Sequence, residues 1–256
     1  MQANGQYQST SALATTPGAY GTSSTSDVAQ LVGTRWDLND GRELILVSTS
    51  SATTTTPGQL YQDAAAIANH SNLVVTAFTA YSNNGDQPAQ VTVTLGGTAV
   101  TANQYQGGYA CVVDGGTGAG QGQFLRIASH PAQTATGGNV VLTLEDSPNV
   151  ALTTSSKVSL VYPHGANVIQ SPTTPTGASV GIALYPIAVS SYGFLTCHGL
   201  ASALSDSTAP LVGQNIAPSV STAGTIAAQT VSTLANIGFA AYTAVSAKSY
   251  QVYLML

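Results

Sequence analysis

The sequence predicts a mainly β protein built of barrel or sandwich domains, and three observations support this prediction. Apolar and polar residues alternate with a period of two over many short segments. Glycine-rich turn sequences separate these segments at intervals of roughly 8–12 residues. A helical spacing of apolar residues is plausible at one place only, so we expect at most one or two short helices.

The first part of the chain predicts an arm, a hairpin and a helix. Residues 1–32 are expected to form an extended N-terminal arm, because almost no large apolar side chain occurs before residue 27. Asp40-Gly41 then supplies the turn of a hairpin between residues 33–36 and 44–47. Apolar residues at helical spacing between Gln59 and His70 predict one short helix.

Segments with a period of two predict the remaining strands of an N-terminal β domain over residues 33–163. A Gly96-Gly97 turn between alternating Val and Thr residues predicts a hairpin of 91–95 with 98–101, and Asn83-Asn84-Gly85 predicts another turn. The other strands are expected at 73–81, 109–113, 123–128, 139–145 and 157–162.

The rest of the chain predicts a second β domain. Three prolines and a threonine cluster occur between Pro163 and residue 177. They predict that residues 164–177 form a linker or a long crossing loop. Residues 178–256 then predict a small C-terminal domain resembling a β-barrel. Its strands are expected near 180–189, 192–198, 211–216, 224–231, 238–245 and 250–256.

Charged side chains are unusually scarce in this protein. Lys, Arg, Asp and Glu make up 6% of the residues, whereas about one-quarter is ordinary. Five cations cannot supply the dense phosphate contacts of a nucleic-acid-binding protein, so we expect no nucleic-acid partner. Few acids and bases are available for catalysis, which favours a protein that is not an enzyme. Any binding is expected to weaken only slightly with added salt.

The sequence shows neither an apolar run of about 18 residues nor a signal peptide. We therefore expect no membrane partner and synthesis in the cytoplasm. Cys111 and Cys197 either pair or remain buried thiols, and the lack of an export signal favours two buried, reduced thiols.

Several motifs that suggest chemistry have simpler structural interpretations. Cys197-His198 are neighbours on a predicted strand and point to opposite faces, so they cannot act as a nucleophile and its base. The glycine-rich run 114–122 is followed by a strand rather than a helix, which indicates a turn and not a phosphate-binding loop. The four histidines are scattered, and Asp37 to Gly41 fails the calcium-loop pattern, so we expect neither a metal nor a cofactor.

The acidic residues suggest a glycan-cleaving site only weakly. Asp114 with Glu145-Asp146 would be the acid pair of such a site. Adjacent carboxylates at a strand end, followed by Pro148, more often mark a turn. We therefore predict no catalytic residue.

Tyrosine dominates the aromatic residues, with twelve Tyr against four Phe and one Trp. Tyrosine is enriched at protein interfaces because its ring packs while its hydroxyl reaches a partner, although ordinary core packing explains the count equally well. Gly193 within an apolar strand indicates that a neighbouring backbone approaches closely. The candidate interface residues are Tyr192, Gly193, Phe194, Leu195, Trp36 and Tyr109.

A series of short motifs occurs in a fixed order between residues 33 and 256. It begins with Gly33-Thr34 and Asp40-Gly41-Arg42 and ends with Tyr192-Gly193-Phe194. Between these lie 58–62, 91–96, 101–109, 114–121, 126–127, 142–146, 151–158 and 180–183. In this order the chain resembles a group of tailed-bacteriophage virion proteins, with Phe194 where that group usually has Trp. The C-terminal third also resembles, more loosely, the small β-barrel cement proteins of phage heads.

The resemblance implies a capsid decoration (cement) protein on the outer surface of a phage head. Its partners would be the major capsid protein and copies of itself, as a homotrimer on local three-fold positions. The alternatives are another virion component, such as a head fibre, a tail protein or a host-binding protein. A glycan-binding or glycan-cleaving β protein is a more distant alternative.

Overall fold

The computed structural model describes residues 31–80, 87–114, 120–134, 137–206, 209–230, 234–242 and 248–256. Within these ranges the protein is built almost entirely of β-strands, and the one helical element with described bounds is a 3-10 turn, η2 (Ala68–His70). The mainly β fold class is therefore confirmed. Most of the predicted arm, the turn at 83–85 and the centre of the glycine-rich run lie outside the described residues.

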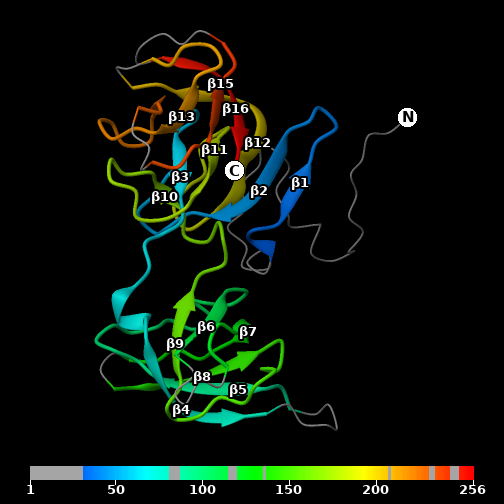
Figure 1. Cartoon of the computed structure of the whole chain (residues 1–256), viewed down its shortest axis with the longest axis vertical. Coiled ribbons are helices and arrows are strands. Elements are labelled where there is room, and N and C mark those ends of the chain that lie inside the picture. The colour runs from blue at the N-terminus through cyan, green and yellow to red at the C-terminus, as the bar shows by residue number, and fades with distance from the viewer. Residues whose placement is uncertain are drawn as a thin grey trace. The chain divides into compact units, whose positions relative to one another are not determined.

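The chain folds into two units whose boundaries differ from the predicted domains. The sheet unit contains the described residues up to Ala65 and His164–Leu256, and the barrel unit contains Ala66–Pro163. In Figure 1 the green strands belong to the barrel unit, while the blue and the orange-to-red strands share the sheet unit. The predicted break between 163 and 164 coincides with the end of the barrel unit. A single domain over 33–163 and a separate domain over 178–256 are wrong, because strands before residue 65 pair with strands after residue 178.

The barrel unit is a closed barrel of six antiparallel strands in the order β4-β5-β8-β7-β6-β9. Alternate residues of these strands point inward and are buried, among them Val75, Val91 and Val93. The sequence locates these strands within a few residues. Their bounds are β4 (Leu73–Thr79), β5 (Gln90–Thr94), β6 (Tyr109–Asp114), β7 (Phe124–Ser129), β8 (Asn139–Leu144) and β9 (Lys157–Val161).

The predicted hairpin between 91–95 and 98–101 is wrong. Strand β5 pairs instead with β4 on one side and with β8 on the other, so both its edges are occupied. Of residues 98–101, Val100 forms an isolated bridge with Gln133. Closure of the barrel therefore determines which strands pair with β5. The local alternation of Val and Thr suggested a different partner.

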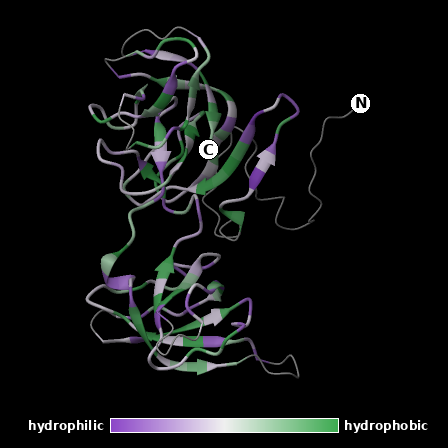
Figure 2. Ribbon diagram, in the orientation of Figure 1, coloured by the Kyte–Doolittle hydropathy of each residue, from purple (hydrophilic) through white to green (hydrophobic). Residues whose placement is uncertain are grey.

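The sheet unit contains a ten-stranded sheet in which β12 (Tyr192–Leu204) contacts β2, β11 and β16. Strand β2 is green along most of its length in Figure 2, in agreement with its four fully buried residues 44–47. The other strands are β1 (Arg35–Asp37), β2 (Glu43–Ser48), β3 (Leu60–Gln62), β10 (Ile169–Gln170), β11 (Ser179–Ala183), β13 (Asn215–Pro218), β14 (Ile226–Ala228), β15 (Gly238–Ala240) and β16 (Ser249–Met255).

The hairpin around Asp40-Gly41 is confirmed, because β1 pairs antiparallel with β2 and Gly41 has a φ of 84°. The helix expected between Gln59 and His70 is wrong. Residues 60–62 form strand β3, which is held between β10 and β11. All three side chains are buried, so pairing within the tertiary structure overrides the weak helical spacing.

The segment 164–177 is an integral part of the sheet unit and not a linker between domains. It contains strand β10, and Val168 within it is fully buried in the core. The alternative of a long crossing loop describes this segment better. Consequently 178–256 does not form a separate small barrel but completes a sheet that begins with β1, β2 and β3.

Candidate interaction surface

The first half of β12, residues 192–197, is covered on both faces. Phe194 packs with Leu44 and Leu46 in one cluster, while Leu195 belongs to another cluster on the opposite face. Both side chains are fully buried, so the prediction that they form an intersubunit surface is wrong. Trp36 is half-buried because its ring lies 4.8 Å from that of Phe194, between the ring centroids.

Gly193 allows a close approach, but by side chains rather than by the backbone that the sequence suggested. A Cβ atom at this position would lie 2.7 Å from Ile187 Cδ1 and 2.9 Å from Tyr185 Oη. The Tyr185 hydroxyl accepts a hydrogen bond of 2.8 Å from the backbone N–H of Phe194. Burial raises the pKa of Tyr185, and this N–H partly offsets the increase. Tyr192 is half-buried beside this contact.

The second half of β12 presents one face to solvent, and this face continues onto its neighbours. Leu200 lies opposite Tyr253 of β16, which lies opposite Phe239 of β15, while His198 lies opposite Met255. Residues paired across a sheet share a face. We call this surface the apolar face; it comprises His198, Leu200, Phe239, Tyr253 and Met255.

The side chains of the apolar face contact one another while remaining partly exposed. Leu200 and Met255 are 47% and 48% exposed. The rings of Phe239 and Tyr253 stack with a centroid distance of 5.2 Å and an interplanar angle of 9°, and His198 meets Tyr253 edge-on. Contiguous exposed apolar side chains often mark an interaction site.

A further exposed apolar side chain and one ion pair lie at the borders of the apolar face. The turn at 211–214 is joined to β15 by a hydrogen bond from Gly213 N–H to Ala240 O, and Leu211 in this turn is 71% exposed. Arg35 binds Glu43 at 3.5 Å and donates to the carbonyl of Leu256 at the end of β16. The face itself carries no side chain with a permanent charge.

The apolar face has a signal in the amino-acid sequence. In residues 198–204 the larger and polar residues alternate with Gly and Ala, whereas residues 192–197 show no such alternation. Period-two alternation is typical of a strand with one exposed face. A continuous apolar run indicates a strand that is covered on both sides. The predicted interface residues of β12 therefore lie in the half of the strand that is covered on both sides.

Tyr109, the remaining candidate, lies on the outside of the barrel unit. Its ring packs on that of Phe124 with a centroid distance of 4.4 Å, and Val161 lies opposite it on β9. Phe124 is 55% exposed. Tyr109 is thus a half-buried member of a second apolar patch, and its role in an interface stays a prediction.

Neither cysteine is paired in the structure. Cys197 is buried, its thiol lies 3.4 Å from the carbonyl of Glu43, and burial raises the pKa of this thiol. His198 points to the opposite, partly exposed face, which confirms that the two neighbours do not meet. Cys111 is half-buried rather than buried.

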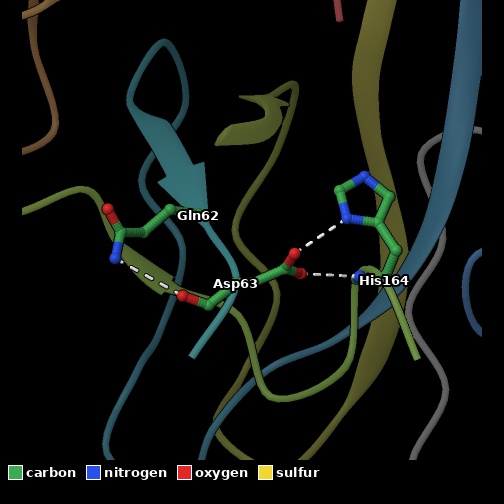
Figure 3. Close-up of polar contacts among 4 residues, drawn as sticks. Gln62, Asp63 and His164 are labelled. Carbon is green, nitrogen blue, oxygen red and sulfur yellow. Dashed lines mark hydrogen bonds and ion pairs between the residues drawn. The ribbon is translucent and has the colours of Figure 1, made fainter. Parts of the chain in front are cut away.

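Asp63 and His164 form the most prominent polar cluster of the sheet unit (Figure 3). One Asp63 carboxylate oxygen contacts His164 Nδ1 at 2.8 Å, and the other accepts the N–H of Gly165 at 2.8 Å. The buried Gln62 amide lies against the Asp63 carbonyl and the Thr176 hydroxyl. Among the described residues no group hydrogen-bonds to His164 Nε2, so the pair lacks the nucleophile that a catalytic triad requires.

Glu145 and Asp114, two of the candidates for an acid pair, lie beside different basic residues. Glu145 forms an ion pair with Arg126 at 3.1 Å, and Asp114 lies opposite Lys157 across two paired strands. In the described part of the chain, no group of three or more His, Cys, Asp or Glu side chains is placed to bind a metal ion. The described residues also include no helix that is long and apolar enough to cross a membrane.

No family model, no curated protein and no solved structure matches this chain. The function is therefore inferred from the residues and from the geometry of the apolar face.

Proposed function

We propose that this protein is a non-enzymatic virion structural protein that decorates and stabilises a phage capsid by bridging capsomers, as a homotrimer. The observation that carries the proposal is the apolar face, which has partly exposed Leu200 and Met255 and no permanent charge of its own. Such a surface binds by shape and apolar contact, and its burial removes no ion from water. The order of phage-like motifs along the chain supports the same role.

A repeating lattice suits weak contacts of this kind. Each face contributes a modest free energy of binding, and symmetry repeats that contribution at every subunit. The major capsid protein would be one partner, and other copies of this chain would be the second. The scarcity of charge is consistent with binding that depends little on salt.

The first test is the copy number of the protein on purified, washed virions. A decoration protein is expected in near-stoichiometric ratio to the major capsid protein. A small number of copies would indicate a fibre, tail or host-binding protein instead. Absence from washed particles would contradict a virion role altogether.

The second test places a charge on the apolar face. Leu200→Glu is expected to weaken head binding at least about tenfold, because a carboxylate would have to be desolvated in an apolar contact. Co-sedimentation with heads measures the effect. Val189→Glu is the matched control, since Val189 is 45% exposed and precedes the covered half of β12. Equal binding of the two variants would exclude the apolar face as the contact.

A neutral glycan is a second candidate ligand, and one observation favours it. The nearly coplanar Phe239 and Tyr253 rings offer a flat apolar platform, and exposed Gln251 lies on the same β16 strand. Binding of oligosaccharides that Tyr253→Ala abolishes, together with absence of the protein from capsids, would favour this role over decoration.

A further inference from the structure

The barrel unit contains two histidines that are almost completely buried around one tyrosine. His70 and His130 are 0% and 3% exposed, and Tyr105 between them is 0% exposed. His70 ends η2 just before β4, His130 follows β7, and Tyr105 lies in the connection between β5 and β6. Tyr162, which follows β9, stacks on Tyr105 with a centroid distance of 4.6 Å.

These four residues gather at one end of the barrel. Leu73 at the start of β4 lies opposite Val158 in an antiparallel pair, so the residues just before β4 run alongside β9 toward its end. The start of β6 lies opposite the end of β9, and the end of β7 lies beside the start of β6. The cluster therefore connects the long segment between β5 and β6 with the residues before β4, after β7 and after β9. Its side chains close this end of the barrel core.

Hydrogen bonding determines the hydrogen positions on both imidazole rings. His70 Nε2 lies 3.0 Å from the carbonyl of Thr98, which only accepts, so Nε2 carries the hydrogen. Its Nδ1 then accepts from the Tyr105 hydroxyl at 2.6 Å. His130 Nδ1 donates to the Pro131 carbonyl at 2.9 Å, and His130 Nε2 accepts the backbone N–H of Tyr105 at 3.0 Å.

These hydrogen bonds are made by neutral imidazole rings in opposite tautomers. A proton added to His130 Nε2 would face the N–H of Tyr105, donor against donor, and this bond would be lost. A proton added to His70 Nδ1 would face the Tyr105 hydroxyl and force its hydrogen to turn away. The other titratable groups that face the pair are the phenols of Tyr105 and Tyr162. No described carboxylate, ammonium or guanidinium group hydrogen-bonds or ion-pairs with either ring.

We propose that His70, Tyr105 and His130 form an acid-operated latch, which holds the β5–β6 connection on the barrel end at neutral pH and releases it in acid. The surroundings of His130 also favour its neutral form. Burial lowers the pKa of His130, the Pro131 carbonyl raises it in part, and a charge on His70 lowers it further.

The sign of the pH effect follows from the lowered pKa. The unfolded or opened chain binds a proton more readily than the closed latch, so closure is favoured by rising pH. The latch has its full stability above pH 6.5, which is the ordinary pKa of a histidine, and it loses stability as the pH falls below this value.

Hydrogen exchange at the Tyr105 amide tests the latch directly in the full-length protein. After correction for the intrinsic exchange rate, the opening constant should rise between about pH 7 and about pH 5, by up to about tenfold per pH unit, because the pKa of His130 is lowered in the closed state. His130→Gln keeps an acceptor near the Nε2 position but does not titrate, so this variant should show a much smaller rise. His198→Gln alters a histidine of the other unit and should follow the wild type.

Two outcomes would overturn the latch. One is a Tyr105 opening constant that does not change with pH in the wild type. The other is a pH dependence in His130→Gln that equals that of the wild type. If His130→Gln fails to fold, proton NMR of the histidine rings in the wild-type protein serves as the test instead. Titration of His130 that leaves the Tyr105 amide resonance and its protection unchanged would then refute the proposal.

Discussion

At the scale of single residues, Gly193 and Tyr185 explain how β12 is joined to the segment that follows β11. The missing side chain of Gly193 leaves room for Ile187 and for the Tyr185 hydroxyl, which reaches the backbone N–H of Phe194 in β12. A buried N–H that lost this acceptor would be costly, because water cannot replace the bond. One hydroxyl group therefore stabilises the part of β12 that lies between two core clusters.

Removal of this hydroxyl is expected to destabilise the sheet unit. Tyr185→Phe should lower the free energy of unfolding by about 1–3 kcal/mol, because the Phe194 N–H would be left buried without its acceptor. Fluorescence of Trp36 reports on this unit, since the single Trp of the chain packs on Phe194. Tyr242→Phe is the control, because Tyr242 is 61% exposed. Equal stability of the two variants would contradict the role of Tyr185.

At the scale of elements, Asp63 joins two segments that are far apart in sequence. The chain leaves the sheet unit after Ala65 and returns at His164, and Asp63 binds both the His164 ring and the Gly165 N–H. The Gly165 carbonyl in turn accepts the N–H of Ser48, at the end of β2. The returning segment is thereby attached to the edge of β2 and to the end of β3.

Loss of this attachment is expected to have a moderate effect. Asp63→Ala should lower the free energy of unfolding of the sheet unit by about 1–2 kcal/mol, mainly because the Gly165 N–H loses its acceptor. The ion pair with His164 is partly exposed and contributes at most about 1 kcal/mol. Denaturant unfolding followed by Trp36 fluorescence measures the change. Asp37→Ala, on exposed β1, should be close to neutral, and an equal loss in both variants would argue against the attachment.

At the scale of the whole molecule, the barrel unit is an insertion into the sheet unit. Its six strands pair only with one another and close around their own apolar core. A closed barrel has no free edge that needs a partner strand. The sheet unit is assembled from both ends of the chain, so its pairing cannot be completed before the C-terminal strands have been synthesised.

The barrel unit is therefore expected to fold alone. A fragment of residues 66–163 should unfold cooperatively, with a free energy on the order of 5–10 kcal/mol. Circular dichroism and denaturant titration measure this transition. A fragment of residues 178–256 is the comparison and should not fold, because it lacks the pairing of β2 and β3 with β12 and β11. The proposed separation into units would be refuted by the reverse result.

The strands were predictable where pattern and turn agree locally. The hairpin around Gly41 and the strands β6 to β9 follow from alternation, glycine and aspartate alone. The helix at 59–70 and the hairpin after residue 95 were not predictable in this way. In both cases a distant strand, β11 for residues 60–62 and β8 for β5, supplied the partner that local spacing could not reveal.

By itself, the sequence determined the β class, the hairpin turn at Gly41 and the scarcity of charge, because these follow from the period, the glycine and the count of charged residues. Only the tertiary structure decided which strands pair across the inserted barrel. It also decided that two distant histidines meet at Tyr105. These properties depend on contacts between residues far apart in the chain, and no local pattern encodes such contacts.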